Sequence, residues 1–400
     1  MHVSKTLDAT CRNPAFRRAL PLATIASLLL TAAAFAQGVS LPPSGGNQKA
    51  SVIQGIGLVE VRIDYSSPDV TGPNGESRKG RIWGQLVPWG LADLGFGNGK
   101  PSPWRAGANE NTVFSVSHDV LVQDKPLPAG RYGLHMIPGE KEWTIVFSRN
   151  SSSWGSFFYD ESEDALRVTA TAQPAEFREW LNYDFIDRQP DRATVALHWE
   201  NLRVPFTIRV PDPTGLYLTK LADELRGTPG FNWQAWDAAA QYCLQSCGDD
   251  RARLEQALAW SEAAVSQPFV GEANFTTLST KARALAALGR DDESIETLRL
   301  AVQHPAATAQ QIHTAARTLQ TQGKTKEAIE LFKLNAERFG ADNWPITVGL
   351  ARAYSAEGQY AKALEYARKA RAQAPDPLNQ GNLDTAIKLL ESGKDFNLSN

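Results

Sequence analysis

Leu350–Pro375, with the sequence LARAYSAEGQYAKALEYARKARAQAP, is the stretch that decides the fold of the C-terminal half. Its glycine recurs upstream, since Gly289, Gly323 and Gly358 are separated by 34 and 35 residues. Five residues after each glycine stands Ser or Ala, followed by Ile or Leu and then by Glu. A fixed period of this length indicates a supersecondary unit that is stacked several times along the chain.

The period and its small residues match tetratricopeptide repeats, in which each unit is a pair of antiparallel helices. Small side chains let the two helices approach closely, the glycine turns the chain, and a proline ends the second helix. The pattern predicts an all-α, tetratricopeptide-like solenoid of about four helix pairs at residues 231–392, with a capping helix near 378–392. A generic helical bundle is the alternative.

Residues 51–210 have a different composition and periodicity. They contain seven Trp and ten Ala, whereas residues 231–400 contain four Trp and 33 Ala, and Ala is the strongest helix former. Apolar and polar residues alternate in stretches such as Val59–Tyr65 and Tyr132–Met136. Because successive side chains of a strand point to opposite faces, the alternation predicts half-buried strands. We expect eight or nine antiparallel strands in an all-β, jelly-roll-like sandwich, followed by a linker with a short helix at 211–230.

The N-terminus has the features of a secretory signal peptide. Four basic residues precede an apolar run from Leu20 to Ala34, and the small-x-small sequence Ala34-Phe35-Ala36 ends it. We expect cleavage after residue 36 and a flexible lead-in at 37–50, which places the mature protein in the periplasm or outside the cell. A membrane anchor is the alternative, but the run is shorter than the roughly 20 residues that span a bilayer. No later segment is apolar enough to span.

The formal net charge is -3, so the chain lacks the excess of Lys and Arg expected of a nucleic-acid-binding surface. After removal of the signal, Cys243 and Cys247 are the remaining cysteines. Their spacing places both thiols on one face of a helix. A disulfide in an oxidising compartment and two small packing residues are the open alternatives.

The densest cluster of polar side chains with binding chemistry lies between Trp104 and Thr112. Arg105 offers a planar fork for carboxylates, phosphates or sugar hydroxyls, and Trp104 offers a flat apolar surface. Asn109 and Glu110 add an amide and a carboxylate. One interpretation is a pocket for a small polar ligand or glycan. The other is a buried network that holds the loop, with Arg105 paired to Glu110 and Asn109 capping the backbone.

Other chemical motifs are weaker. Gly95-x-Gly97-x-Gly99-Lys100 lacks the strand–loop–helix context and the Lys-Ser/Thr ending of a phosphate loop. His118 lies on the apolar parity of a predicted strand and is interpreted as a core histidine. His118, His135 and Glu110 form a metal site only if three strands converge, and no ligand spacing supports that. We therefore expect neither a metal nor a cofactor.

Several motifs in the first half resemble one family. They are Lys79-Gly80-Arg81-x-Trp83-Gly84, Trp104-Arg105-x-Gly107-Ala108-Asn109-Glu110-x-Thr112, Leu127-Pro128-Ala129-Gly130-x-Tyr132 and Glu142-Trp143-Thr144-Ile145-Val146-Phe147. Over roughly residues 50–210 the chain resembles the bacterial secreted family known as domain of unknown function 2911. The resemblance implies no activity, substrate or catalytic residue. Two departures are an apparent insertion at 90–103 and a histidine, His135, where an apolar or aromatic residue is expected.

Arg81, within the first of these motifs, and His135 join Trp104, Arg105, Asn109 and Glu110 as candidate ligand-binding residues. The hypothesis favoured by the sequence is a non-catalytic binding or scaffold protein. Its repeats would contact a protein partner and its β-domain would hold the small polar ligand or glycan. The alternative is a hydrolase acting on envelope material, with Glu110 or a histidine as acid/base. For the repeats, docking against the β-domain as a brace is the alternative to partner binding.

Overall fold

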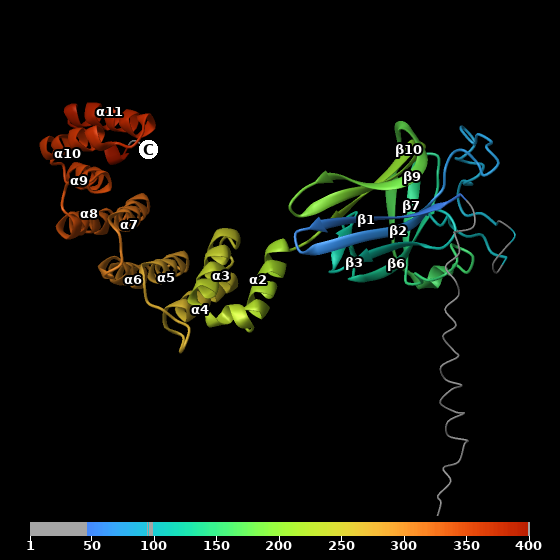
Figure 1. The fold of residues 1–400 in the computed structure, drawn as a ribbon, viewed down its shortest axis with the longest axis horizontal. Coiled ribbons are helices and arrows are strands. Elements are labelled where there is room, and N and C mark those ends of the chain that lie inside the picture. Colours follow the sequence, from blue (N-terminus) through green and yellow to red (C-terminus); the bar gives the residue numbers. More distant parts are fainter. Residues whose placement is uncertain (1–45, 94, 96–98, 399–400) are drawn as a thin grey trace, which may run out of the picture.

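The structure, a computed structural model, describes residues 46–93, 95 and 99–398 and contains a β region followed by an α region (Figure 1). Within these residues, ten strands precede ten helices, which confirms the predicted fold class. The predicted signal peptide lies outside the described residues. Strand β1 begins at Gln48, inside the segment expected to be a flexible lead-in.

Two antiparallel sheets make up the β region. The six-stranded sheet has the order β1-β2-β3-β6-β7-β8, and the four-stranded sheet has the order β5-β4-β10-β9. The first sheet consists of β1 (Gln48–Ile56), β2 (Val59–Ser67), β3 (Thr112–Val116), β6 (Gly130–Ile137), β7 (Glu142–Ser148) and β8 (Asp164–Thr171). The second consists of β4 (Val120–Val122), β5 (Lys125–Leu127), β9 (Gln173–Arg188) and β10 (Arg192–Arg209).

A single apolar core lies between the sheets. The alternating residues of β2 that the sequence marked as apolar, Val59 to Tyr65, are all buried in it. Phe147 of β7 and Phe206 of β10 meet across the core with ring centroids 6.1 Å apart. β6 and β7 form a hairpin that turns around Pro138-Gly139-Glu140, and Met136 pairs with Ile145 in it. The period of two therefore predicted the buried face of these strands correctly.

The segment around His118 differs from the expectation. Apolar residues at every second position from Phe114 to Val122 predicted one continuous strand. Instead, β3 and β4 belong to different sheets, and the chain crosses from one sheet to the other at residues 117–119. His118 lies in this crossing, is half-buried, and contacts the Ser117 hydroxyl through Nδ1 at 2.9 Å. The interpretation as a core histidine is therefore wrong, because the parity rule holds only within one continuous strand.

The α region consists of four helix pairs and a last helix, as the repeat period predicts. The pairs are α3 (Trp233–Ser246) with α4 (Arg251–Ser266), α5 (Phe275–Ala287) with α6 (Asp291–Gln303), α7 (Ala309–Thr321) with α8 (Thr325–Phe339), and α9 (Trp344–Ala356) with α10 (Tyr360–Gln373); α11 (Pro377–Glu391) follows. Gly289, Gly323 and Gly358 all have φ between 73° and 77° in the turns inside their pairs. Glycine adopts this left-handed conformation without steric cost, which explains its recurrence.

Helix α2 (Pro213–Glu224) joins the two regions. Asp212 caps its N-terminus by accepting a hydrogen bond from the Gly215 amide. Leu216 packs against the core of the sheets, whereas Leu218 and Leu221 pack against the α3–α4 core. Figure 1 shows the later helices following one another away from the sheets. In the described residues the repeats therefore do not dock against the sheets as a brace. Helix α2 connects the two regions instead.

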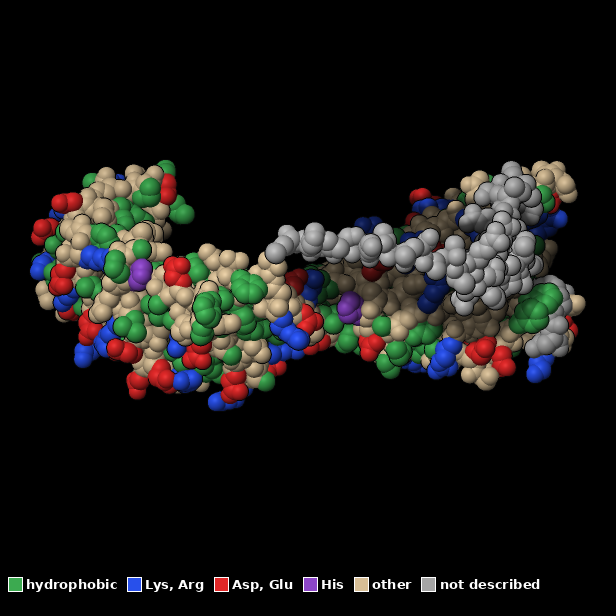
Figure 2. Space-filling model, turned by 60° about the horizontal axis from the view of Figure 1, so that its bottom comes forward, with side chains coloured by type: hydrophobic (Ala, Val, Ile, Leu, Met, Phe, Trp, Pro, Cys, Tyr) green, Lys and Arg blue, Asp and Glu red, His purple; other side chains and the backbone are tan. Residues whose placement is uncertain are grey.

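The surface and the helices carry two further observations. On the face seen in Figure 2, acidic and basic side chains are interspersed over both regions. Within residues 46–93, 95 and 99–398, none of the helices combines the length and the apolar character that crossing a bilayer requires.

Candidate functional site

The loop that contains Arg105 and Asn109 is held in place by its own polar groups. The Arg105 guanidinium donates a hydrogen bond to the Asn109 carbonyl. Ala106 and Asn109 have φ of 50° and 57°. The Ala106 carbonyl accepts hydrogen bonds from the Tyr183 hydroxyl at 2.8 Å and from the Thr112 hydroxyl at 3.1 Å. Because Tyr183 belongs to the opposite sheet, these bonds tie the loop across the sandwich.

Glu110 does not pair with Arg105. Its carboxylate forms a salt bridge with Lys49 of β1 at 2.9 Å and accepts a hydrogen bond from the Ser66 hydroxyl at 3.1 Å. The hydrogen bond from Lys49 lowers the pKa of Glu110 below its usual value. The prediction that Arg105 pairs with Glu110 is therefore wrong. Lys49 is far from Glu110 in the sequence and reaches it only because β1 lies beside this loop in the folded sheet.

Trp104 is part of an aromatic cluster at one end of the sandwich. Its ring stacks on Trp199 at a centroid distance of 6.3 Å and an interplanar angle of 17°. Trp83 contacts Trp104, Trp143 and Trp199 edge-on, at 5.9, 5.3 and 5.7 Å. Trp143 and Trp199 are fully buried. The Trp104 ring therefore packs on the core, where each aromatic contact adds about 0.5–1.5 kcal/mol beyond its buried area.

His135 lies on the face of β6 that points away from the core, beneath the segment that follows β7. The ring is 2% exposed, and its Nδ1 is 2.8 Å from the Ser156 hydroxyl. The Tyr159 ring packs edge-on against it at 5.5 Å. Burial, with a smaller effect of the Arg105 charge, lowers the pKa of His135 to about 4. The histidine is therefore neutral in the folded protein over most of the pH range.

Arg105 is half-buried and lies near enough to His135 for its charge to lower the pKa of that histidine. Its guanidinium packs against Gly155, where an added Cβ would lie 2.3 Å from the Arg105 Cζ. No described carboxylate forms a salt bridge with this arginine, and burial lowers its pKa. Trp154 and Phe158, on the same segment as Gly155, expose 55% and 61% of their surface. A guanidinium without a carboxylate partner can bind a carboxylate, a phosphate or a glycan.

Sequence reasoning missed Trp154, Gly155 and Ser156 as parts of this arrangement. Nothing in the spacing along the sequence placed this segment beside Arg105, which lies about 50 residues earlier in the chain. A second set of polar contacts continues from Tyr159, whose hydroxyl donates to Asp164 at 2.8 Å. Arg167 donates to the same carboxylate at 2.6 Å.

A polar pocket of about 270 Å³ lies on the outer face of β1, β2 and β3. Glu110 and Asn111 line it together with Asp64, Arg131 and Ser151–Ser153. It carries both signs of charge, since Lys49 also borders it. Arg105 and His135 do not line this pocket. The candidate ligand-binding residues Arg105 and Glu110 therefore belong to the same loop but not to the same pocket.

Arg81 lies apart from the other candidates. It is exposed, and its guanidinium donates to the Ser77 carbonyl within the same loop. Among the described residues, no group of three His, Cys, Asp or Glu side chains is arranged to hold a metal ion. The convergence of His118, His135 and Glu110 considered above does not occur.

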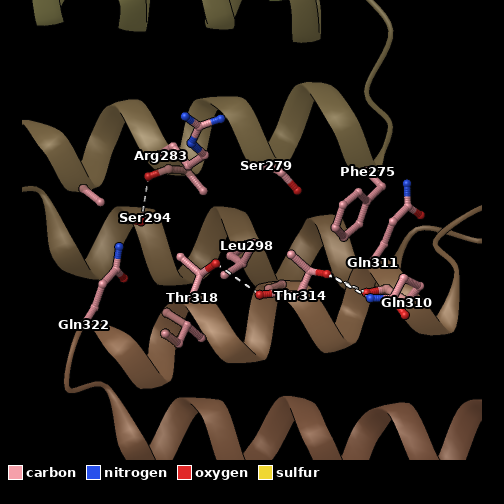
Figure 3. A pocket seen from close by; sticks show the side chains of 14 residues that line it. Phe275, Ser279, Arg283, Ser294, Leu298, Gln310, Gln311, Thr314, Thr318 and Gln322 are labelled. Carbon is pink, nitrogen blue, oxygen red and sulfur yellow. Dashed lines mark hydrogen bonds between the residues drawn. The ribbon is translucent and has the colours of Figure 1, made fainter. Parts of the chain in front are cut away.

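The repeats contain a second candidate site, between α5 and α7. Helix α3 packs closely on α5, and α7 on α9, but α5 and α7 do not pack in this way. The space between them is a pocket of about 250 Å³ with an apolar floor that includes Leu298 of α6. Figure 3 shows Ser279 and Arg283 of α5 on one side, and Thr314 and Thr318 of α7 on the other.

The rim of this pocket is polar and almost uncharged. Gln310, Thr314 and Thr318 of α7 and its C-cap residue Gln322 recur every four residues and form one stripe beside the pocket. The hydroxyls of Thr314 and Thr318 bond to backbone carbonyls four residues earlier. Arg283 supplies the one basic group among the residues that line the pocket. An apolar floor with a rim of hydrogen-bonding groups is typical of a site that anchors one side chain of a bound segment.

Comparison with known protein families gives one match in each half of the chain. Residues 47–208 match a family described as protein of unknown function (DUF2911), and residues 348–376 match the tetratricopeptide repeat. The chain thus carries a domain of unknown function 2911 followed by tetratricopeptide repeats, which confirms the resemblance seen in the sequence. A search of curated proteins found no match.

Two solved structures are similar to parts of the chain. One, titled MamA AMB-1, is 17% identical and covers 39% of this chain and 82% of its own, with a TM-score of 0.27. The other is described as nearly identical TPR-like repeats of a kinesin light chain from Podosopora anserina. It is 22% identical and covers 40% of this chain and 85% of its own, with a TM-score of 0.30.

Proposed function

We propose that this protein is an exported, non-catalytic binding protein whose helical repeats hold an extended segment of a partner protein. The observation that carries the proposal is the pocket between α5 and α7, because it leaves an apolar floor open beside a row of hydrogen-bonding side chains. Helix α3 packs on α5, and α7 on α9, whereas α5 and α7 leave room between them for a bound side chain.

The β-domain adds a second binding surface to the proposal. Arg105, which forms no salt bridge with a described carboxylate and packs against Gly155 in the segment that also carries the exposed Trp154 and Phe158, suits a small anionic ligand or an acidic glycan. This surface would recognise a molecule different in kind from the one bound by the repeats. The protein would then bring the two together, as a scaffold does.

The hydrolase alternative receives no support from the candidate residues. A general acid or base works best with a pKa near the operating pH, but the Lys49 contact moves the pKa of Glu110 further down. The His135–Ser156 contact has a length suited to a nucleophile and its base, but both side chains are buried by the segment above them. A substrate would have no direct approach to this pair.

Export is tested by the N-terminus of the mature protein. After expression in the native cell, sequencing of the purified protein should begin at Gln37, and the protein should appear in the periplasmic or secreted fraction. An intact Met1 terminus with a cytoplasmic distribution would refute this part of the proposal.

Partner binding is tested with a display library of peptides of known sequence selected on the full-length protein. Thr318→Trp places a large ring over the pocket and should abolish binding of the selected peptides. Glu296→Trp, at an exposed position of α6 that does not line the pocket, is the matched control. Peptides that bind both variants equally well would show that the pocket is not the binding site.

A further inference from the structure

The pocket between α5 and α7 has two structural equivalents in the later repeats. Because the repeat glycines are 34 and 35 residues apart, positions that line the pocket have counterparts at the same offsets. The sets are Ala282, Ala316 and Ala351; Arg283, Arg317 and Arg352; Ala286, Gln320 and Ser355; Ser294, Ala328 and Ala363; Leu298, Phe332 and Ala367. Each repeat therefore places the same set of positions between its first helix and the first helix of the next repeat.

In the middle repeat this space is filled by the chain itself. Phe332 of α8 stands where the first space has Leu298, and its ring is buried. It packs against the backbone of α9 at Gly349, where an added Cβ would lie 2.6 Å from the ring. A phenyl ring is thus the natural occupant of this space, and glycine opposite makes room for it.

In the last repeat a phenyl ring also fills the space, but it comes from the C-terminal segment. Ala367 leaves the position of Phe332 empty, and Phe396 of the short helix η4 (Phe396–Leu398) is buried among Ala351, Ala363 and Ala367. The segment after α11 folds back to deliver this side chain. This C-terminal segment is an example, within the protein itself, of how a segment with a phenylalanine fills the space between the helices of a repeat.

The polar residues beside Phe396 contact the equivalent arginine. Asn397 accepts a hydrogen bond from the Arg352 guanidinium at 3.1 Å and donates one to the Arg352 carbonyl at 3.0 Å. The guanidinium also lies over the Phe396 ring at 5.1 Å from its centroid. Asp395 accepts a hydrogen bond from the Ser355 hydroxyl at 2.5 Å. An aromatic residue flanked by a carboxylate and an amide therefore satisfies this face of the repeat.

The first space has the same arginine, Arg283, but Leu298 stands where the next repeat has Phe332, and the ring that lines this pocket is Phe275, from the first residue of α5. Leu298 is shorter than phenylalanine, and the pocket of about 250 Å³ remains above it. Among the described residues no salt bridge or hydrogen bond of the Arg283 side chain accompanies that opening, and the side chain is exposed. Leu298 thus supplies an apolar surface and Arg283 supplies a basic group. We call the space above Leu298 the seat, because no described side chain fills it as Phe332 and Phe396 fill its equivalents.

We infer that the pocket between α5 and α7 binds a partner segment in which an aromatic residue is flanked by Asp or Asn, in the manner of Asp395-Phe396-Asn397. The inference rests on the proposed function and specifies its partner. The ring would occupy the space above Leu298, and the neighbouring carboxylate or amide would accept a hydrogen bond from Arg283. Burial of the ring supplies the affinity and the arginine contact selects the flanking residue.

The test uses the full-length protein and a synthetic peptide with the sequence of residues 393–398, Gly-Lys-Asp-Phe-Asn-Leu, in isothermal titration calorimetry. We expect binding to the parent protein, and no binding of the same peptide with Phe replaced by Ala. Leu298→Phe fills the seat as Phe332 does in the next repeat and should weaken binding at least about tenfold. Arg283→Gln, at an exposed position, should weaken it severalfold without a change in folding.

Circular dichroism of Leu298→Phe shows whether this variant is folded, and Arg283→Gln serves as the second variant if it is not. Phe396→Ala removes the ring from among Ala351, Ala363 and Ala367. The peptide should then bind this variant at two equivalent sites instead of one. Absence of binding to the parent at millimolar peptide, or equal binding to the parent and both pocket variants, would overturn the inference. If library peptides without an aromatic residue still require the pocket that Thr318→Trp blocks, the inference fails while the proposed function stands. If no peptide is sensitive to Thr318→Trp, the proposed function fails.

Discussion

Burial of His135 makes the stability of the β-domain depend on pH. The unfolded chain binds the proton with an ordinary pKa of 6.5, whereas the folded protein binds it with a pKa of about 4. Between these values the unfolded state carries more protons, so the free energy of unfolding falls as the pH is lowered from 6.5 to 4. Above pH 6.5 the contribution of this histidine is fully present.

The size of the effect follows from the two pKa values. Lowering the pH from about 7.5 to about 5 should reduce the free energy of unfolding by about 2 kcal/mol through His135 alone. His135→Gln keeps a polar group near Ser156 but cannot take up a proton in this range. The loss between the two pH values should therefore be smaller in this variant by about the same amount.

Urea unfolding at both pH values measures the difference between parent and variant. His313 in the repeats also has its pKa lowered to about 4 by burial, but its contribution cancels in that difference. Ser156→Ala is the control, because it removes the hydrogen bond and keeps the titrating ring. It should lower stability by about 1 kcal/mol at both pH values and leave the pH dependence intact. An NMR titration that gives His135 a pKa near 6.5, or equal pH dependence in parent and His135→Gln, would refute the reasoning.

Four further outcomes test other parts of the structure. Gly155→Ala places an alanine at a positive φ of 58° and its Cβ against the Arg105 guanidinium, so the β-domain should lose about 1–3 kcal/mol, and an unchanged melting temperature would contradict the packing. Glu110→Gln removes an exposed ion pair and should change the free energy of unfolding by less than about 1 kcal/mol, whereas a large loss in urea unfolding would point back to a buried pair. Phe396→Ala should cost about 3–5 kcal/mol locally and speed hydrogen exchange in α10 and α11, but not in α3 to α6, because each repeat contacts only its neighbours. Burial raises the pKa of the Cys243 thiol to about 12, so native protein in reducing buffer at pH 8 should resist alkylation that proceeds readily in denaturant, as mass spectrometry can show.

The sequence predicted those features that depend on local periodicity. Alternation in Val59–Tyr65 identified the buried face of β2, and the glycine period identified every helix pair from α5 to α10. Both signals survive folding because a strand or helix has a fixed geometry per residue. The same rule failed at His118, where the chain leaves one sheet for the other.

The contacts of the candidate site could not be predicted, because they join residues far apart in the chain. Glu110 pairs with Lys49 only because β1 lies at the edge of the sheet beside β2, and Trp104 meets Trp199 only across the sandwich. The Arg105–Glu110 pair expected from their nearness in sequence ignored these competitors. The pocket between α5 and α7 could not be predicted from the sequence either. Its equivalents are recognised only from the positions of Phe332 and Phe396 in the folded repeats.

The junction at α2 has a mechanical consequence. Since Leu216 packs against one core and Leu221 against the other, a load applied to the described repeats would reach the sheets through α2. The bond between Asp212 and Arg253 of α4 fastens its first turn to the helical side. Under tension the helix can give way only by withdrawing apolar side chains from a packed interior, so it transmits force and orientation together in the way that a rigid strut does, and a tether does not.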